Sequence, residues 1–304
     1  MNREQTIARL KGIFPPVVTP FDRHGELDLG AFRSNLVRLL DAGLPGVLVC
    51  GSTGEAPLLT WRERLRLVEA ARRVVRPPQL LLVGTGLEST PETIRLSREV
   101  SRRGADALLV VTPGYYKPKM DAPAVRQHYL RVADAVHRPV LIYSIPQFTG
   151  VHIEVETIVA LSRHPNIRGL KESSGNIKFV RKVLSRVRPG FKVLVGSVLI
   201  LLDALRAGAA GAVLGQADFA PDLCAGLYHA FGQRRIREAK EFQRRLLPLG
   251  EKISLPFGVA GVKAALDLCA YSGGDPRSPL IPLDAAERRL VAAALREAYA
   301  GLEY

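Results

Sequence analysis

The sequence predicts an α/β protein built as a (β/α)8 barrel, and two features of the 304-residue chain support this prediction. The first is a series of eight short runs rich in valine, leucine and isoleucine, which are continuous and do not alternate with polar residues. Continuous apolar runs are expected of parallel strands that are buried on both faces. The expected strands are residues 12–19, 46–50, 80–84, 105–112, 139–144, 167–171, 192–196 and 211–215.

The second feature is the helical period of the segments between these runs. In residues 29–42, for example, the apolar side chains recur at the spacing of an amphipathic helix. Thr90 is expected to cap another helix, because Pro91 follows it at a position that proline favours. The other expected helices are 61–75, 123–136, 154–163, 176–187 and 198–207. This alternation favours a closed (TIM) barrel over a doubly wound sheet, for which the dinucleotide fingerprint is missing.

The pattern changes after residue 215. Segments 221–243, 255–268 and 285–299 have helical period and follow one another without intervening strands. We therefore expect a barrel over residues 1–220, which carries the active site, and a C-terminal helical extension over 221–304. The extension is expected to pack on the barrel or to serve in oligomerisation.

Composition narrows the class of protein. With 47% hydrophobic and 24% charged residues, the chain has the composition of a soluble globular protein. It contains no apolar stretch of the roughly 18 residues that cross a membrane, and its first residues do not resemble a secretion signal. A cytoplasmic protein that does not bind membranes is expected.

Charge and metal-ligating residues point away from two other functions. The net charge of +14 comes from basic residues that are scattered along the expected helices and interleaved with acids, so nucleic-acid binding is not expected. The histidines have no metal-ligand spacing, and the three cysteines form no C-x-x-C pair. We expect no metal site, and cysteines that are small buried residues.

Polar residues follow several of the expected strands, at the end where barrel enzymes place their sites. Lys171 closes one strand and is a candidate nucleophile, which requires a neutral, desolvated amine; a strand-end lysine that reaches into solvent is the alternative. Tyr143 closes the preceding strand and could transfer protons, or it could be a packed aromatic residue. The glycine-flanked pair Ser52 and Thr53 offers backbone N–H groups that suit a carboxylate, or it forms an ordinary tight turn.

Four motifs resemble the dihydrodipicolinate synthase/N-acetylneuraminate lyase family of class I, pyruvate-dependent aldolases. They are Gly51-Ser52-Thr53-Gly54-Glu55, Val111-Thr112-Pro113 followed by Tyr115, Tyr143-Ser144-Ile145-Pro146 with Thr149-Gly150, and Gly169-Leu170-Lys171-Glu172. The resemblance covers the barrel and continues into the helical extension.

The resemblance implies a role for each matching residue. Lys171 would form an imine with pyruvate, and Tyr143 would relay protons. Thr53 would pass hydrogen bonds from Tyr143 to Tyr115, which would complete the site of an adjoining subunit. Backbone amides of Ser52 and Thr53 would hold the pyruvate carboxylate. The residues expected to line the rest of the substrate site are Gly196, Val213 and Phe148. The lysine imine replaces any cofactor, and a homotetramer built as a dimer of dimers is implied.

Departures from the family pattern bear on the second substrate. Phe148 stands where a dihydrodipicolinate synthase usually has an arginine that binds a carboxylate, and Ser144 replaces the usual asparagine. The motifs are closest to 4-hydroxy-2-oxoglutarate aldolase. We therefore expect a lyase that forms or cleaves a 4-hydroxy-2-oxo acid, with pyruvate and a small aldehyde or oxo acid as substrates. One alternative is a 4-hydroxy-tetrahydrodipicolinate synthase that condenses pyruvate with aspartate semialdehyde. The other is a non-catalytic barrel that binds an oxo acid.

Overall fold

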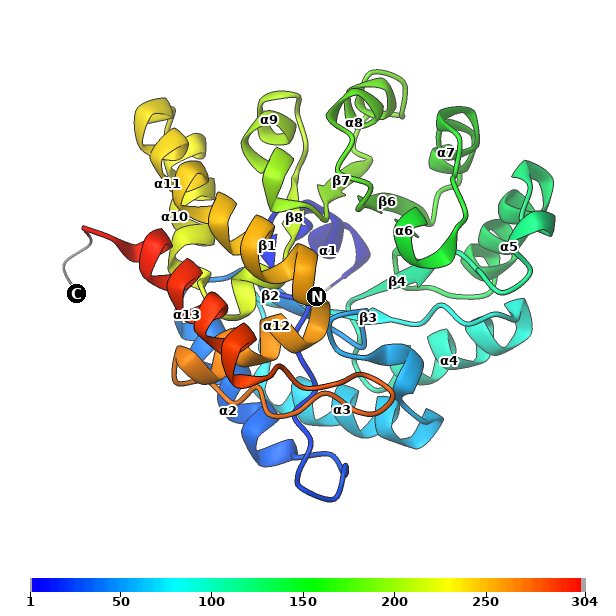
Figure 1. Ribbon diagram of the computed structural model, residues 1–304. Coiled ribbons are helices and arrows are strands. Elements are labelled where there is room, and N and C mark those ends of the chain that lie inside the picture. The colour runs from blue at the N-terminus through cyan, green and yellow to red at the C-terminus, as the bar shows by residue number, and fades with distance from the viewer. Residues whose placement is uncertain (1, 302–304) are drawn as a thin grey trace.

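The computed structural model describes residues 2–301 and confirms the predicted barrel (Figure 1). Eight parallel strands form one sheet in the order β1-β8-β7-β6-β5-β4-β3-β2. The strands are β1 Gly12–Phe14, β2 Gly46–Val49, β3 Leu80–Gly84, β4 Ala107–Val111, β5 Val140–Ser144, β6 Ile167–Glu172, β7 Lys192–Val195 and β8 Gly211–Val213. The first strand is shorter than the expected 12–19, since Pro15 and Pro16 have no N–H group to donate to a neighbouring strand.

Helices surround the strands as the sequence predicted (Figure 1). Those between strands are α2 Leu29–Asp41, α3 Trp61–Val74, α4 Thr90–Arg102, α5 Ala122–Asp134, α7 Val155–Ser162, α8 Ile177–Leu184 and α9 Leu201–Arg206. The cap of α4 is Ser89, whose Oγ accepts from the Glu92 N–H at 3.2 Å. Thr90, the expected cap, instead places its Oγ1 2.8 Å from His128 Nδ1.

Several short elements were not expected from the sequence. Helix α1 (Arg3–Arg9) precedes the first strand, and α6 (Pro146–Thr149) follows β5. The other unexpected turns are η1 Ala56–Leu58, η2 Lys117–Lys119, η4 Gly215–Asp218 and the π-helical η5 Gly250–Ser254. Their shortness explains why helical periodicity did not reveal them, because a single turn has no repeat. The turn η3 Val198–Ile200 forms the start of the helix that was expected over 198–207.

The C-terminal extension packs beside the barrel where β8, β1 and β2 lie (Figure 1). Its helices are α10 Pro221–Gly232, α11 Ile236–Leu249, α12 Leu255–Leu268 and α13 Ala285–Tyr299. The single helix expected over 221–243 is wrong: it breaks between α10 and α11, where Arg234 has a φ of 60°. A left-handed residue ends a helix, and here it is an arginine and not the glycine that would have signalled the break.

Two apolar layers hold the barrel together. One fills its interior and includes Phe14, Leu48, Leu109, Leu194 and Val213. The other lies between the strands and the helices around them. Alternate residues of each strand therefore point inward and outward, and the interior is a packed core that leaves the strand ends to hold a site.

Candidate active site

Lys171 and Tyr143 lie side by side at the ends of neighbouring strands. They are directly paired in the register of β5 and β6. Lys171 Nζ lies 4.2 Å from the centre of the Tyr143 ring, and each residue is only 4% exposed. The amine is thus held out of bulk water against an aromatic face, which is the environment that Schiff-base chemistry requires of a lysine.

The hydroxyl group of Tyr143 meets Ser52. Its Oη lies 3.2 Å from Ser52 Oγ, which links the end of β5 to residues 51–55, here called the β2 loop. We expected Thr53 to make this contact, and that expectation is wrong. Thr53 Oγ1 is turned toward Gly215, where an added Cβ would lie 3.9 Å from it. In a tight turn, successive side chains point in different directions, so only one of the two hydroxyls can face the tyrosine.

Glu55 fastens the β2 loop to the C-terminal extension. Its backbone is left-handed, with a φ of 56°. One carboxylate oxygen accepts the Arg277 backbone N–H at 2.7 Å, and the other lies 2.7 Å from Lys263 Nζ on α12. The Glu55 and Lys263 side chains are almost completely buried. This ion pair was missed from the sequence, although a lysine within the apolar helix α12 was a signal for it.

A second ion pair supports the first. The Arg277 guanidinium donates to both oxygens of Glu63, at 2.9 and 2.6 Å. The Phe21 ring lies 4.1 Å from the Arg277 guanidinium and 4.6 Å from Lys263 Nζ. Hydrogen bonds from Arg277, and to a smaller extent from Thr60, lower the pKa of Glu63 from 4.5 to about 2, against the opposing effect of burial. The extension therefore fixes the β2 loop through paired charges.

Two expected substrate-site residues border Lys171 and Tyr143. Gly196 donates its N–H to the Glu172 carbonyl at 2.7 Å. A Cβ at this position would lie 1.9 Å from Ser173 Oγ, so the close approach of the two strand ends requires glycine. Val213 is buried and packs in the same interior cluster as Tyr143.

Tyr115 and Phe148, by contrast, are on the surface. The Tyr115 side chain is 77% exposed and packs edge to face against Tyr116 at 5.0 Å. Its backbone N–H and that of Gly114 donate to Glu88. Phe148, on α6, is 71% exposed. The structure does not bring these two side chains into contact with Lys171.

Two buried acids near Lys171 were also missed. Glu172, the next residue on β6, accepts the Ser174 N–H at 2.9 Å, and burial raises its pKa. Asp218, at the end of η4, is completely buried. Burial raises its pKa well above the ordinary value of 3.8, and the charge of Lys171 acts on it in the opposite direction.

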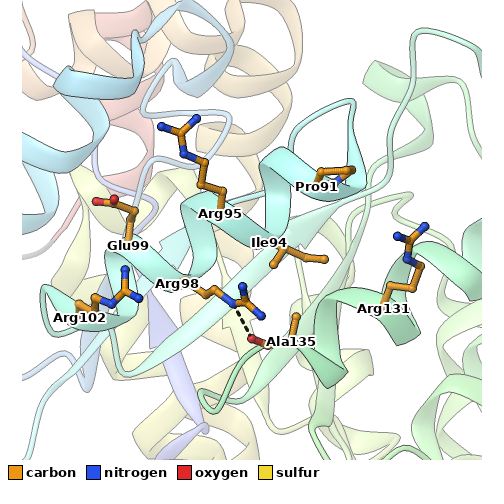
Figure 2. A pocket seen from close by; sticks show the side chains of 8 residues that line it. All are labelled: Pro91, Ile94, Arg95, Arg98, Glu99, Arg102, Arg131 and Ala135. Carbon is orange, nitrogen blue, oxygen red and sulfur yellow. Dashed lines mark hydrogen bonds between the residues drawn. The ribbon is translucent and has the colours of Figure 1, made fainter.

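A groove of about 550 Å³ on the outer face of the barrel is separate from these residues. It lies between α4 and α5 and contains Arg95, Arg98, Arg102 and Arg131 (Figure 2). Arg98 donates to the Ala135 carbonyl at 2.9 Å, so one of the N–H donors of its guanidinium group already has a partner within the protein. None of the strand-end residues lines the groove, and the candidate site is therefore assigned at the barrel mouth.

Features of two other protein classes are missing from the part of the chain that the structure describes. Within residues 2–301, no three histidine, cysteine, aspartate or glutamate side chains gather so that they could hold a metal ion. Over the same residues, no helix has both the length and the apolar character needed to span a bilayer.

The fold and the strand-end residues define the class of protein, an enzyme of the (β/α)8 barrel type with a buried lysine at its mouth. A model of the dihydrodipicolinate synthetase family matches residues 9–298. The chain belongs to this family and is a carbon–carbon lyase.

Curated relatives match along nearly their full length. A 4-hydroxy-tetrahydrodipicolinate synthase of Methanoculleus marisnigri is 34% identical over 280 residues, which cover 91% of this chain and 95% of the relative. A DapA-like lyase of Halobacterium salinarum is 36% identical over 288 residues, covering 95% and 94%.

Solved structures of the family superpose on nearly the whole chain. The dihydrodipicolinate synthase DapA-2 of Bacillus anthracis has a TM-score of 0.91 at 27% identity, and the match covers 97% of this chain and 99% of that one. YagE of Escherichia coli, a member of the dihydrodipicolinic acid synthase family solved in complex with pyruvate, has a TM-score of 0.90 at 30% identity, with coverages of 95% and 98%.

Proposed function

We propose that the protein is a Schiff-base-forming aldolase that uses pyruvate. The observation that supports this most is the buried contact of Lys171 Nζ with the Tyr143 ring, at strand ends that also adjoin the β2 loop. A related protein, YagE, was solved in complex with pyruvate. No cofactor is required, because the lysine imine itself accepts the electrons of the reaction.

In the proposed reaction, backbone N–H groups of Ser52 and Thr53 bind the pyruvate carboxylate. The Lys171 amine attacks the keto carbon, and the carbinolamine loses water to give a protonated imine. Tyr143, whose hydroxyl meets Ser52, moves protons between the carbinolamine, the departing water and the product oxygen. Loss of a methyl proton from the imine gives an enamine, which attacks the aldehyde. Hydrolysis then frees Lys171, and the reverse order cleaves a 4-hydroxy-2-oxo acid.

Two second substrates are supported by different observations. Phe148 stands at the position where a dihydrodipicolinate synthase usually has an arginine that binds the carboxylate of aspartate semialdehyde. The phenylalanine ring cannot bind a carboxylate in this way, and this favours a 4-hydroxy-2-oxo acid such as 4-hydroxy-2-oxoglutarate as the substrate. The names of the relatives favour the synthase reaction with equal or greater weight. We propose the cleavage or formation of a 4-hydroxy-2-oxo acid as the first candidate reaction and the synthase reaction as the second.

A side-by-side assay separates the two candidates. Pyruvate release from 4-hydroxy-2-oxoglutarate is compared with pyruvate consumption in the presence of aspartate semialdehyde, at equal enzyme concentration. A kcat/KM at least tenfold higher for the first substrate supports the aldolase. The reverse ratio supports the synthase. No turnover of either, and no trapped pyruvate, would leave an oxo-acid-binding barrel.

We also propose a homotetramer in which Tyr115 reaches the site of an adjoining subunit. This proposal is supported by the exposure of both Tyr115 and Tyr116, which lie next to each other in the segment after β4. Such an exposed aromatic pair is typical of a subunit contact. Light scattering of the wild type and of Tyr115→Ala tests this, since a monomeric wild type would contradict it.

A further inference from the structure

The groove between α4 and α5 has no part in the proposed reaction, yet arginines line both of its sides. Arg95, Arg98 and Arg102 extend from α4, and Arg131 extends from α5 (Figure 2). The groove, here called the arginine groove, has a volume of about 550 Å³. This volume lies within the usual range for sites that bind small molecules.

A smaller hollow of about 320 Å³ adjoins the arginine groove along α5. Arg131 lines both hollows, and Arg126 lines the second. Arg126 is exposed, as is its neighbour Gln127. The basic surface therefore extends along α5 beyond Arg131, and its length suits an elongated anion.

The acidic residues of the two helices do not neutralise this surface. Each of them pairs with another side chain: Glu92 with Arg95 at 3.6 Å, Glu99 with Arg103 at 2.6 Å and Asp134 with His164 at 2.9 Å. Within residues 2–301, none of these ion pairs includes Arg102 or Arg131. Glu99 is the one acid that lines the groove, and its partner Arg103 takes up its charge.

Three guanidinium groups are thus free to bind an anion. Arg98, Arg102 and Arg131 are exposed, and only Arg98 uses one donor within the protein, for the Ala135 carbonyl at 2.9 Å. Arg98 and Arg102 lie four positions apart on α4, where two like charges repel each other. A bound anion would remove this repulsion and would use the donors that the protein leaves open.

The side chains of the groove favour phosphate over other anionic groups. The planar guanidinium group donates two parallel hydrogen bonds to phosphate oxygens. No aromatic side chain lines either hollow, so the bases of a nucleic acid would have no ring on which to stack. The apolar lining consists of Pro91, Ile94 and Ala135, which do not form the deep pocket that anchors a peptide.

We propose that the arginine groove binds an oligophosphate, a chain of linked phosphate groups, through Arg98, Arg102 and Arg131. Such a chain carries several negative charges in a row and matches the arginines that face each other from α4 and α5. The site is separate from the proposed aldolase reaction, because none of the strand-end residues lines it. Binding is noncovalent, and no group changes its charge.

The test is titration calorimetry of the whole protein with inorganic tripolyphosphate. The wild type is compared with the double variant Arg102→Gln/Arg131→Gln, which removes two exposed side chains that take no part in an ion pair within residues 2–301. We expect the affinity to fall about tenfold or more, because two charged contacts with the anion are lost. Affinity of the wild type should also fall as NaCl rises from about 0.05 to about 0.2 M.

The matched control is Arg33→Gln/Arg289→Gln. It removes the same number of charges from exposed positions on α2 and α13, outside the groove. Its affinity should equal that of the wild type within about twofold. An equal loss in both double variants would mean that the anion responds only to the net charge of +14, and the proposal would be wrong. Wild-type protein that does not bind tripolyphosphate would equally overturn it.

Three further ligands test the chemical class. ATP has the same number of phosphates and should bind no more tightly than tripolyphosphate, since the groove has no ring for the base. A single-stranded oligonucleotide and an oligoglutamate of equal charge should both bind more weakly. Tighter binding of any of the three would contradict the assignment to a phosphate chain.

The pyruvate adduct on Lys171 separates this inference from the proposed function. Arg102→Gln/Arg131→Gln should form the adduct with borohydride to the same extent as the wild type, because both arginines lie outside the barrel mouth. A protein that binds tripolyphosphate in the groove but forms no adduct would support the inference while the proposed function fails. Loss of the adduct in this variant would show that the groove is not a separate site.

Discussion

The ion pair of Arg277 with Glu63 links the C-terminal extension to the barrel, and its strength can be worked out from the structure. The two hydrogen bonds of 2.9 and 2.6 Å are the largest of the contributions that lower the pKa of Glu63 to about 2, compared with 4.5 in the unfolded chain. A depressed carboxyl pKa stabilises the fold above pH 4.5. That stabilisation is lost progressively as the pH falls from 4.5 toward 2.

The magnitude follows from the interval between the two pKa values. Each pH unit in this interval is worth about 1.4 kcal/mol of folding free energy, so the whole shift is worth about 3.5 kcal/mol, of which hydrogen bonds from Thr60 supply a part. The side chains are 19% and 12% exposed, and solvent screening reduces this to about 2 kcal/mol. We expect Arg277→Gln to lower the free energy of unfolding at pH 7 by about 2 kcal/mol, and by less at pH 3.

Urea unfolding, followed by the fluorescence of the single tryptophan, measures this at pH values from 7 to 3. Arg244→Gln is the control, because Arg244 pairs with Glu241 on an exposed surface of α11; exposed pairs contribute little. If Arg277→Gln and the wild type lose stability in parallel between pH 5 and pH 3, the depressed pKa of Glu63 does not arise from Arg277, and the reasoning fails.

Three further predictions concern the site. Ser52→Ala should lower kcat at least tenfold, since it removes the hydroxyl that meets the tyrosine, and Thr53→Val should have a smaller effect; equal effects in steady-state kinetics would contradict the corrected assignment. Phe148→Arg should raise kcat/KM for aspartate semialdehyde about tenfold or more by supplying a carboxylate anchor, and an unchanged value would place specificity elsewhere. Lys263→Met should destabilise the fold by about 3–5 kcal/mol in urea unfolding, because Glu55 is left buried without its counter-charge; a change below about 1 kcal/mol would refute this.

The sequence was sufficient to predict those features of the fold and the site that depend on local patterns. Continuous apolar runs marked all the strands, and strand ends marked Lys171 and Tyr143, because the parallel order of a barrel brings those ends together. The helix break at Arg234 was missed, because the left-handed residue is an arginine, while Gly232, which was a signal nearby, is itself the last residue of α10. The short turn η4 did not show a helical repeat, and Asp218 therefore passed unnoticed.

Two features of the site could not be predicted from the sequence: the directions of the side chains and the pairing of residues that lie far apart in the chain. Spacing alone could not decide whether Ser52 or Thr53 faces the tyrosine, because both lie in one tight turn. The partners of Glu55 come from the C-terminal extension, and Arg277 lies 222 positions away in the chain. No local pattern connects residues so far apart, so the fastening of the β2 loop became visible only in the folded chain.

The most direct test of the central claim is to trap the imine and locate it. The protein is treated with pyruvate and borohydride, digested, and its peptides are mapped by mass spectrometry, with Lys171→Arg as the control. The account predicts a stable gain of about 72 Da on Lys171 and on no other lysine, and none in the variant. A folded wild-type protein that gains no mass at Lys171 would contradict it.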